Sequence, residues 1–170
     1  MVGLIVAGGL VFLEERSGLL KEGSPAPEFT ATLSTGETVS LGDYRGKKNV
    51  VLFFYPRDFT PGCTEQVCSL RDNYADIIKL DAVIFGVSRD DRSSHAEFIA
   101  THHLPFSLIS DVNKSVIRLF AVERLWGLVG VPKRVTYVID KRGIIRLVSH
   151  HEVLIGKHIE EVVAALQHLE

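Results

Sequence analysis

Long apolar runs alternate with amphipathic stretches along this 170-residue chain, and their order predicts its secondary structure. Segments 49–55 and 82–88 are mostly apolar and of strand length, as expected for strands covered on both faces of a sheet. The stretch between them repeats apolar residues at helical spacing, which predicts one long helix beginning near residue 61. Its apolar positions are Val67, Leu70, Tyr74, Ile77 and Ile78.

Weaker patterns complete the sheet and its helices. Segments 29–33 and 37–41 flank a Ser-Thr-Gly turn and predict a β-hairpin near the N-terminus. The remaining elements are a helix opened by a capping box at Ser94–Glu97 and running toward His102, a strand 106–109, a helix 113–122, a strand 134–140, its hairpin partner 144–150 and a helix 155–169. This order predicts an α/β fold with a mixed central sheet flanked by helices on both faces.

An apolar segment precedes the main domain. Residues 2–13 are all apolar or glycine, but a membrane-spanning helix needs about 20 residues, and the basic start of a signal peptide is absent. We therefore interpret residues 1–19 as an N-terminal extension that packs on the domain or on another chain. Membrane contact through residues 1–13 is the less favoured alternative. Residues 20–170 then form one domain, entered through the turn-rich stretch 21–27.

Composition narrows the class of protein. A net charge of -2 and a pI near 6.4 argue against a nucleic-acid-binding surface. Two cysteines are too few for a secreted disulfide scaffold and suit a reducing compartment with a catalytic thiol pair. We expect a cytoplasmic protein, with membrane association through the N-terminal segment as the alternative.

Both cysteines lie in the stretch 55–72, between an apolar strand and the long predicted helix. Thr60 can cap this helix with its hydroxyl, and Pro61 suits the first helical position. Cys63 then falls in the first turn, where free backbone N–H groups and the helix dipole favour an anion. The sequence therefore predicts that Cys63 reacts as a thiolate, and that it faces the core because it continues the apolar stripe.

Cys68 follows Cys63 by five positions, which separates the two thiols on a helix. The two residues differ by about 140° in rotation and about 7.5 Å in height, so their Cα atoms would be about 8.6 Å apart. A disulfide needs about 7 Å or less. The two cysteines can therefore pair only if the first turn or two of the helix unwinds.

The motifs around Cys63 resemble those of the peroxiredoxins. Pro56, Thr60 and Cys63 have the spacing of that family's active-site motif, and the string from Thr60 to Asp72 is similar to the bacterioferritin comigratory protein branch, also called the peroxiredoxin Q type. Segment 134–140 followed by Gly143 resembles the strand that carries the family's active-site arginine, and segment 26–29 resembles its usual opening. The resemblance covers roughly residues 20 to 169.

This resemblance implies a thioredoxin-like fold and a thiol peroxidase with a role in antioxidant defence. Cys63 would reduce hydrogen peroxide or organic hydroperoxides and become a sulfenic acid, which Cys68 would resolve as an intramolecular disulfide. A thioredoxin-type dithiol would reduce that disulfide. The resemblance also implies a monomer or a homodimer, and it implies neither an organic cofactor nor a metal.

The residue chemistry is consistent with these roles. Arg134 can supply a permanent cation that favours the Cys63 thiolate and binds a peroxide oxygen. The backbone N–H groups of Gly62 and Cys63 and the hydroxyl of Thr60 can donate hydrogen bonds where charge develops. Pro56 can fix the backbone ahead of the loop and exclude water from one wall. We expect Gln66 and Arg71 to support the helix rather than contact substrate.

Other interpretations stay open. A membrane-tethered thioredoxin-like disulfide oxidoreductase would suit the apolar N-terminus, but such proteins normally use Cys-x-x-Cys, which is absent. A holdase without turnover is a second alternative. The pairs His102–His103 and His150–His151 invite a metal site, yet we expect solvated loop histidines because both pairs fall at predicted element ends. The apolar loop 126–130 would line either the substrate mouth or an oligomer contact.

Overall fold

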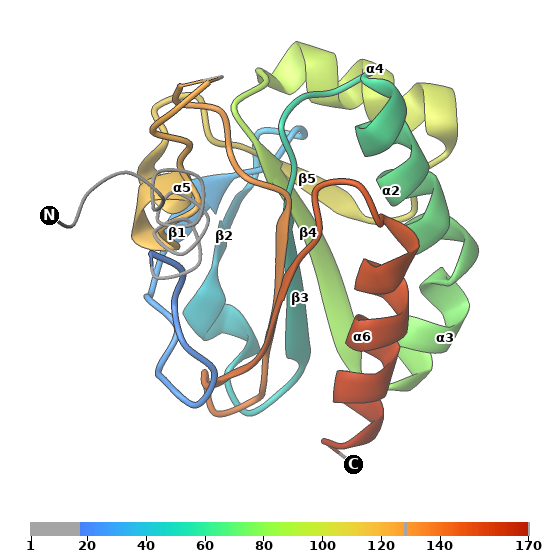
Figure 1. The fold of residues 1–170 in the computed structure, drawn as a ribbon. Coiled ribbons are helices and arrows are strands. Elements are labelled where there is room, and N and C mark those ends of the chain that lie inside the picture. The colour runs from blue at the N-terminus through green and yellow to red at the C-terminus, as the bar shows by residue number, and fades with distance from the viewer. Residues whose placement is uncertain (1–17, 128, 170) are drawn as a thin grey trace, which may run out of the picture.

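The computed structural model describes residues 18–127 and 129–169, and a five-stranded mixed sheet forms the centre of this part of the chain (Figure 1). In the order β5-β4-β3-β6-β7, β4 pairs in parallel with β3 and β5, whereas β6 pairs antiparallel with β3 and β7. The strands are β3 (Asn49–Phe54), β4 (Ala82–Ser88), β5 (Ser107–Ser110), β6 (Val135–Ile139) and β7 (Ile145–His150). A separate hairpin consists of β1 (Thr30–Thr32) and β2 (Thr38–Ser40).

The central strand β3 is buried on both faces, which explains its unbroken apolar sequence. Val50, Leu52 and Phe54 belong to one core, and Val51 and Phe53 belong to the other. The hairpin, the 3-10 helix η1 (Leu41–Tyr44) and α5 (Ser115–Leu119) cover the first core. The second core lies under α2 (Pro61–Asp72), α3 (Tyr74–Lys79), α4 (Arg92–His102) and α6 (Gly156–Gln167), as Figure 1 shows for α2, α3 and α6.

The predicted fold class is confirmed, including the helices on both faces of a mixed sheet and the N-terminal hairpin. Each strand predicted from the sequence is present, and the strand ends differ from the prediction by at most one residue. Continuous apolar runs and turn residues therefore located the sheet correctly.

The single long helix predicted after residue 61 is wrong, because the chain forms two helices that meet at Asn73. The backbone N–H and the side-chain amide of Asn73 both donate to the Ser69 carbonyl, which closes α2. Short polar side chains compete for backbone groups in this way and end helices. The apolar stripe turns at this break, so Ile77 is buried while Ile78 is 38% exposed.

Two further helix starts differ from the prediction. Asp91, not Ser94, caps α4, and its carboxylate accepts a hydrogen bond from the backbone N–H of Ser94 at 2.8 Å. The start of α5 is tied to Asp111, whose carboxylate accepts from the backbone N–H groups of Val116 and Ile117. An aspartate accepts these N–H groups as well as serine does, so the sequence did not distinguish the two caps.

Residues 1–17 lie outside the described residues, so the predicted N-terminal extension and its membrane alternative are not described here. Across 18–127 and 129–169, no helix has both the length and the apolarity to cross a membrane.

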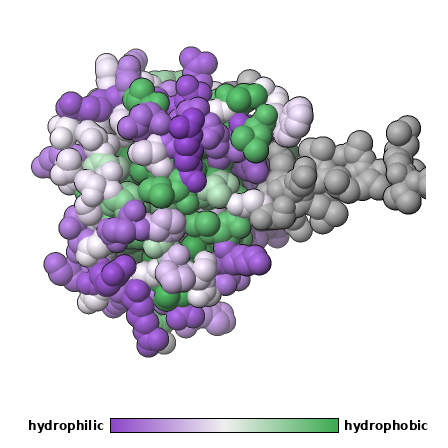
Figure 2. Space-filling view, turned by 90° about the vertical axis from the view of Figure 1, so that its left-hand side faces the viewer, coloured by the Kyte–Doolittle hydropathy of each residue, from purple (hydrophilic) through white to green (hydrophobic). Residues whose placement is uncertain are grey.

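Figure 2 shows apolar residues gathered near the centre of the face at the left of Figure 1, with hydrophilic residues around them. In the predicted apolar loop, Trp126 and Val129 are 74% and 64% exposed, so both point away from the core.

The sheet register brings two distant segments to one place. Phe54, the last residue of β3, lies opposite Val135, the first residue of β6. The chain before β6 therefore approaches the loop after β3, although about 80 residues separate them in the sequence. That loop leads directly into α2 and its two cysteines.

Candidate active site

Cys63 is fully buried in the first turn of α2, with the guanidinium of Arg134 beside it. Both terminal nitrogens of Arg134 lie 3.5 Å from the Cys63 sulfur and donate to it. Cys63 faces the core as predicted, in contact with the apolar cluster that includes Val67 and Leu70. The structure thus brings together the two residues that the sequence separates by 71 positions.

Arg134 places a permanent positive charge beside the Cys63 sulfur. Arg134 is only 6% exposed, and no carboxylate among the described residues forms an ion pair with its guanidinium. A buried cation without a counterion is costly, so this site suits a negatively charged group beside the guanidinium. The backbone N–H groups at the first turn of α2 favour negative charge in the same place.

Gln66 holds the guanidinium in place. Its side-chain oxygen accepts a hydrogen bond from Arg134 Nη1 at 2.8 Å, and the residue is 1% exposed. The amide nitrogen of Gln66 and Nε of Arg134 are buried donors without an acceptor in the described part of the chain. Gln66 therefore also fixes the guanidinium of Arg134, a contact that the sequence analysis did not predict.

The absence of a side chain at Gly62 leaves room for that cation. A Cβ atom at this position would lie 3.1 Å from Arg134 Nη2 and 3.3 Å from Cδ1 of Ile155. Both distances are tighter than ordinary van der Waals contact, so the guanidinium or the isoleucine would have to move. Glycine at this position is thus explained by close packing.

Thr60 and Pro56 lie in the loop between β3 and α2. Thr60 occupies the position before the helix, but its hydroxyl donates to the Arg57 carbonyl at 3.0 Å and makes no capping bond. The predicted side-chain cap is therefore wrong, and no hydrogen bond joins this hydroxyl to Cys63 among the described residues. Pro56 is half-buried and directly follows the fully buried Tyr55.

Cys68 lies further along α2, half-buried, and neither cysteine is in a disulfide. Because both residues belong to one continuous helix, the separation of about 8.6 Å expected from helical geometry applies. The Cys68 sulfur lies 3.8 Å from Nδ1 of His102, the last residue of α4.

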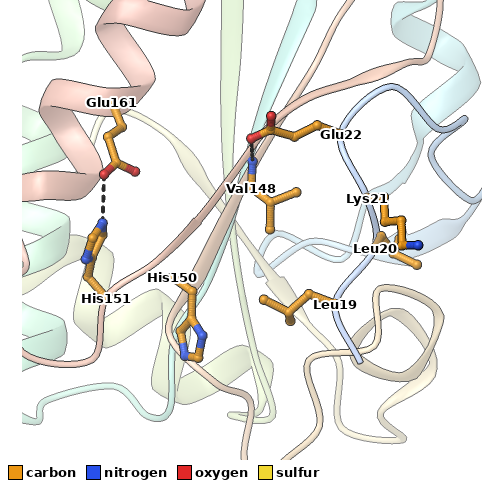
Figure 3. A pocket seen from close by; sticks show the side chains of 8 residues that line it. All are labelled: Leu19, Leu20, Lys21, Glu22, Val148, His150, His151 and Glu161. Carbon is orange, nitrogen blue, oxygen red and sulfur yellow. Dashed lines mark hydrogen bonds and ion pairs between the residues drawn. The ribbon is translucent and has the colours of Figure 1, made fainter. Parts of the chain in front are cut away.

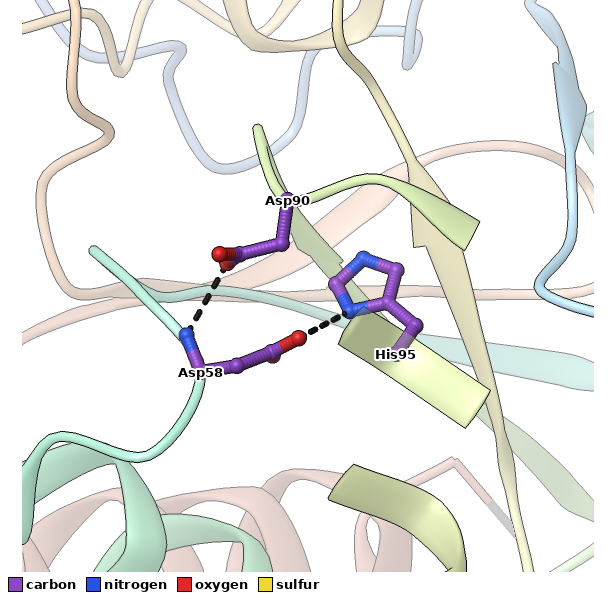
Figure 4. A group of neighbouring side chains, drawn as sticks. All are labelled: Asp58, Asp90 and His95. Atoms are coloured by element: carbon purple, nitrogen blue, oxygen red, sulfur yellow. Dashed lines mark hydrogen bonds and ion pairs between the residues drawn. The ribbon is translucent and has the colours of Figure 1, made fainter. Parts of the chain in front are cut away.

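A buried network that the sequence analysis missed anchors the loop after β3 (Figure 4). Nδ1 of His95 lies 2.8 Å from a carboxylate oxygen of Asp58, and the two side chains are 0% and 1% exposed. Nε2 of His95 lies 3.0 Å from the Ile109 carbonyl, so both ring nitrogens lie within hydrogen-bond distance of an oxygen. The backbone N–H of Asp58 donates to Asp90 at 2.9 Å.

Asp58, Asp90 and His95 also have the proximity of a metal site, yet their atoms are already engaged. The two oxygens of Asp58 accept from the Tyr55 hydroxyl at 2.6 Å and from the Ser94 hydroxyl at 2.8 Å, in addition to His95. Burial and the neighbouring Asp58 raise the pKa of Tyr55, which keeps its hydroxyl a donor. The cluster therefore fits an anchoring network better than a cation site.

Glu152 supports Arg134 from the other side. Its carboxylate accepts the backbone N–H of Arg134 at 3.2 Å, pairs with Arg124 at 2.5 Å and lies 3.0 Å from Nε2 of His150. Burial alone would raise the pKa of Glu152, but these partners outweigh it and lower the pKa to about 2. The carboxylate thus fixes the chain just before β6.

The paired histidines are not solvated loop residues, apart from the exposed His103. His102 contacts Cys68, and His150 and His151 pair with Glu152 and Glu161. His150 and His151 line a pocket of about 500 Å³ between β7 and segment 19–22 (Figure 3). None of the candidate catalytic residues lines this pocket, so its volume does not define the reactive site.

Comparison with known proteins agrees with this geometry. A model of the AhpC/TSA family matches residues 23–148. The chloroplastic peroxiredoxin Q of Triticum aestivum is 41% identical over 153 residues, which cover 89% of this chain and 69% of that protein. Among solved structures, peroxidoxin BcpB from Mycobacterium tuberculosis has a TM-score of 0.82 at 32% identity, covering 89% of this chain and 99% of that one. Xanthomonas campestris peroxiredoxin Q has a TM-score of 0.76 at 30% identity, with coverages of 82% and 90%.

The fold, the buried thiol and these similarities define a thiol peroxidase with a thioredoxin-like fold. The chain belongs to the AhpC/TSA family and, within it, to the peroxiredoxins of the Q type.

Replacing Gly62 by alanine should displace the active-site cation. The added Cβ would press on Arg134 and Ile155, whose side-chain ends can shift, so we expect the fold to persist while the rate of Cys63 with peroxide falls about tenfold. Stopped-flow kinetics of peroxide reduction measures this. Gly156→Ala is the matched control, because no atom lies within 4 Å of its added Cβ. Equal rates for Gly62→Ala and the control would contradict the packing explanation.

Replacing Glu152 by glutamine should lower stability in a pH-dependent way. The folded-state pKa of about 2 lies below the ordinary 4.5, so the carboxylate stabilises the fold fully above about pH 4.5, and this contribution is lost as pH falls toward about 2. The difference in unfolding free energy between Glu152→Gln and the unsubstituted chain, measured by urea denaturation, should shrink from neutral to acidic pH. Glu160→Gln, at an exposed residue paired with Lys157, is the control. A difference independent of pH would show that the ionised carboxylate is not responsible.

Proposed function

We propose that this chain reduces hydrogen peroxide and organic hydroperoxides through a peroxidatic Cys63, that Cys68 resolves the product as an intramolecular disulfide, and that a thioredoxin-type dithiol completes the cycle. The observation that carries the proposal is the contact of both terminal nitrogens of Arg134 with the buried Cys63 sulfur. The family membership supplies the reaction class.

In the first step the Cys63 thiolate attacks the terminal peroxide oxygen. An S–O bond forms, the O–O bond breaks, and the departing alkoxide takes a proton from water while Cys63 becomes a sulfenic acid. Arg134 stays protonated throughout and stabilises the charge that moves from sulfur to oxygen. The buried donors at Arg134 Nε and the Gln66 amide, together with the backbone N–H groups of Gly62 and Cys63, can bind the peroxide oxygens.

Thr60 and Pro56 act from the loop before α2. The hydroxyl of Thr60 hydrogen-bonds only its own loop in this structure, and it can rotate toward a bound peroxide. Pro56 shields one wall of the site. These two roles depend on the family motif, and Thr60→Val compared with Thr60→Ser separates the hydroxyl from the side-chain shape.

In the second step α2 unwinds at its start, and the Cys68 sulfur attacks the Cys63 sulfur. An S–S bond forms, the S–O bond breaks, and hydroxide leaves and is protonated to water. Two features support unwinding here. The helix begins without a side-chain cap, which removes about 1 kcal/mol of stabilisation, and Phe59 just before it has a φ of 62°, a conformation that aromatic residues rarely adopt.

In the third step a dithiol reduces the disulfide by thiol exchange. A thioredoxin-type partner, a monomeric or homodimeric state and a cytoplasmic location remain predictions. The alternative of a membrane-tethered disulfide oxidoreductase gains no support, because both cysteines lie in one helix at a spacing of five instead of Cys-x-x-Cys.

Serine variants of the two cysteines test this cycle. Following peroxide loss with a thioredoxin system, we expect Cys63→Ser to lose turnover by several orders of magnitude because it lacks the nucleophile. Cys68→Ser should consume one equivalent of peroxide, form a sulfenic acid and then stall. Full turnover by Cys63→Ser would refute the peroxidatic assignment, and normal recycling of Cys68→Ser by thioredoxin would show that no resolving cysteine is needed.

A further inference from the structure

The basic side chains of His102 and Arg71 lie beside Cys68, and the proposed cycle gives neither of them a role. Its sulfur lies 3.8 Å from Nδ1 of His102, within the distance of a hydrogen bond to sulfur. The guanidinium of Arg71 approaches from the next turn of α2, and Nη1 of Arg71 donates to the His102 carbonyl at 2.7 Å. The end of α4 is thus joined to α2 at Cys68 and at Arg71.

His102 lies at the C-terminal end of α4, with its ring packed among aromatic side chains. As the last residue of α4, it lies at the negative end of the helix dipole. Its ring packs edge-on against Phe98, with the ring centroids 5.1 Å apart. The centroid of the Phe59 ring lies 6.3 Å away, so aromatic rings restrict the orientation of the imidazole. In the described part of the chain, no carboxylate hydrogen-bonds or pairs with this imidazole.

The groups that face Cys68 are therefore basic on both helices. The pKa of Arg71 is raised, first by its hydrogen bond to Asp72 and also by the neighbouring Cys68. On the α4 side the neighbour is His102, and the adjoining Phe59 and Phe98 are uncharged. Asp72 is the one acidic neighbour in the described contacts, and it is bound to Arg71.

We propose that His102, assisted by Arg71, is the base that deprotonates Cys68 and prepares it for attack on the Cys63 sulfenic acid. This role rests on the two-cysteine cycle proposed above. The Cys68 S–H proton passes to Nδ1 of His102, which gives a thiolate paired with an imidazolium. The thiolate then displaces hydroxide from the Cys63 sulfur, and the hydroxide gains a proton to leave as water.

The same pairing re-forms after the return step. When a dithiol reduces the disulfide by attack on the Cys63 sulfur, Cys68 departs as a thiolate, and it returns to its contact with His102 when α2 refolds. The contact with His102 also belongs to the folded helix, so the thiolate exists before α2 unwinds.

Alkylation of Cys68 tests the assignment without any peroxide. In a Cys63→Ser background, iodoacetamide reacts only with Cys68, and the rate follows the thiolate fraction. We expect His102→Asn to slow alkylation at neutral pH about tenfold and to move the midpoint of the rate–pH curve up by about one unit. His103→Asn is the matched control, since His103 is exposed and its left-handed backbone (φ 52°) suits asparagine.

An unchanged alkylation rate and midpoint in His102→Asn would overturn the proposal. Circular dichroism shows whether the variants are folded. The control His103→Asn should leave the alkylation rate and midpoint unchanged. Because His102→Asn could also expose Cys68, a faster alkylation at every pH would likewise overturn the proposal.

A second measurement separates this proposal from the cycle on which it rests. In the chain with both cysteines, one equivalent of peroxide is added and the disulfide is followed by rapid quenching and mass spectrometry. We expect His102→Asn to slow disulfide formation about tenfold while the oxidation of Cys63 keeps its rate. Absence of a disulfide in the unsubstituted chain would refute the cycle, whereas normal disulfide formation in His102→Asn would refute only the role of His102.

Discussion

Arg134 carries a permanent positive charge that the fold buries beside Cys63, and much of the surrounding structure exists to hold it there. A buried cation is costly unless polar groups surround it, so the neighbours of the guanidinium are constrained to hold it. Gln66 fixes one guanidinium nitrogen, and Glu152 fixes the backbone at Arg134. Gly62 leaves the space that the cation fills.

The loop and the helix on either side of Thr60 are held very differently. Before it, Asp58 is buried, and its two carboxylate oxygens are bound by the side chains of Tyr55, Ser94 and His95. After it, α2 starts with no side-chain cap, a difference of only about 1 kcal/mol from a capped start. The helix start is therefore held less strongly than the loop, as the proposed unwinding of α2 requires.

The sequence predicted what depends on local pattern. Apolar runs located the strands, because burial on both faces of a sheet leaves a continuous signal, and the motif located Cys63 in a first helical turn. The break at Asn73 and the aspartate that caps α4 depend on which of several competing polar side chains captures a backbone N–H or carbonyl, which pattern alone does not decide.

Local sequence patterns did not predict the contacts between residues that are far apart in the chain. Asp58 and His95 are 37 positions apart, and Cys68 and His102 are 34 apart. The sequence predicts a capping box that includes His95 and a solvated position for His102. Both predictions miss the contacts because they leave out the packing of α4 on α2. Arg134 was identified only through the family motif, because 71 positions separate it from Cys63.

One face of α4 contacts both the loop before α2 and Cys68 within α2. His95, Phe98 and His102 are spaced by three and four residues, so they form one helical stripe. His95 anchors the loop, Phe98 packs against Phe59, and His102 contacts Cys68. The stripe therefore positions the segment before Cys63 and the thiol that follows it.

The two thiols contact two different kinds of basic side chain, and the difference suits the different steps proposed for Cys63 and Cys68. Cys63 meets a guanidinium that cannot lose its proton, so its stabilisation persists while charge moves from sulfur to the peroxide oxygen. Cys68 meets an imidazole that can accept a proton near neutral pH, through a contact that ends when α2 unwinds. A titratable partner on a separate helix deprotonates the thiol and then lets it leave.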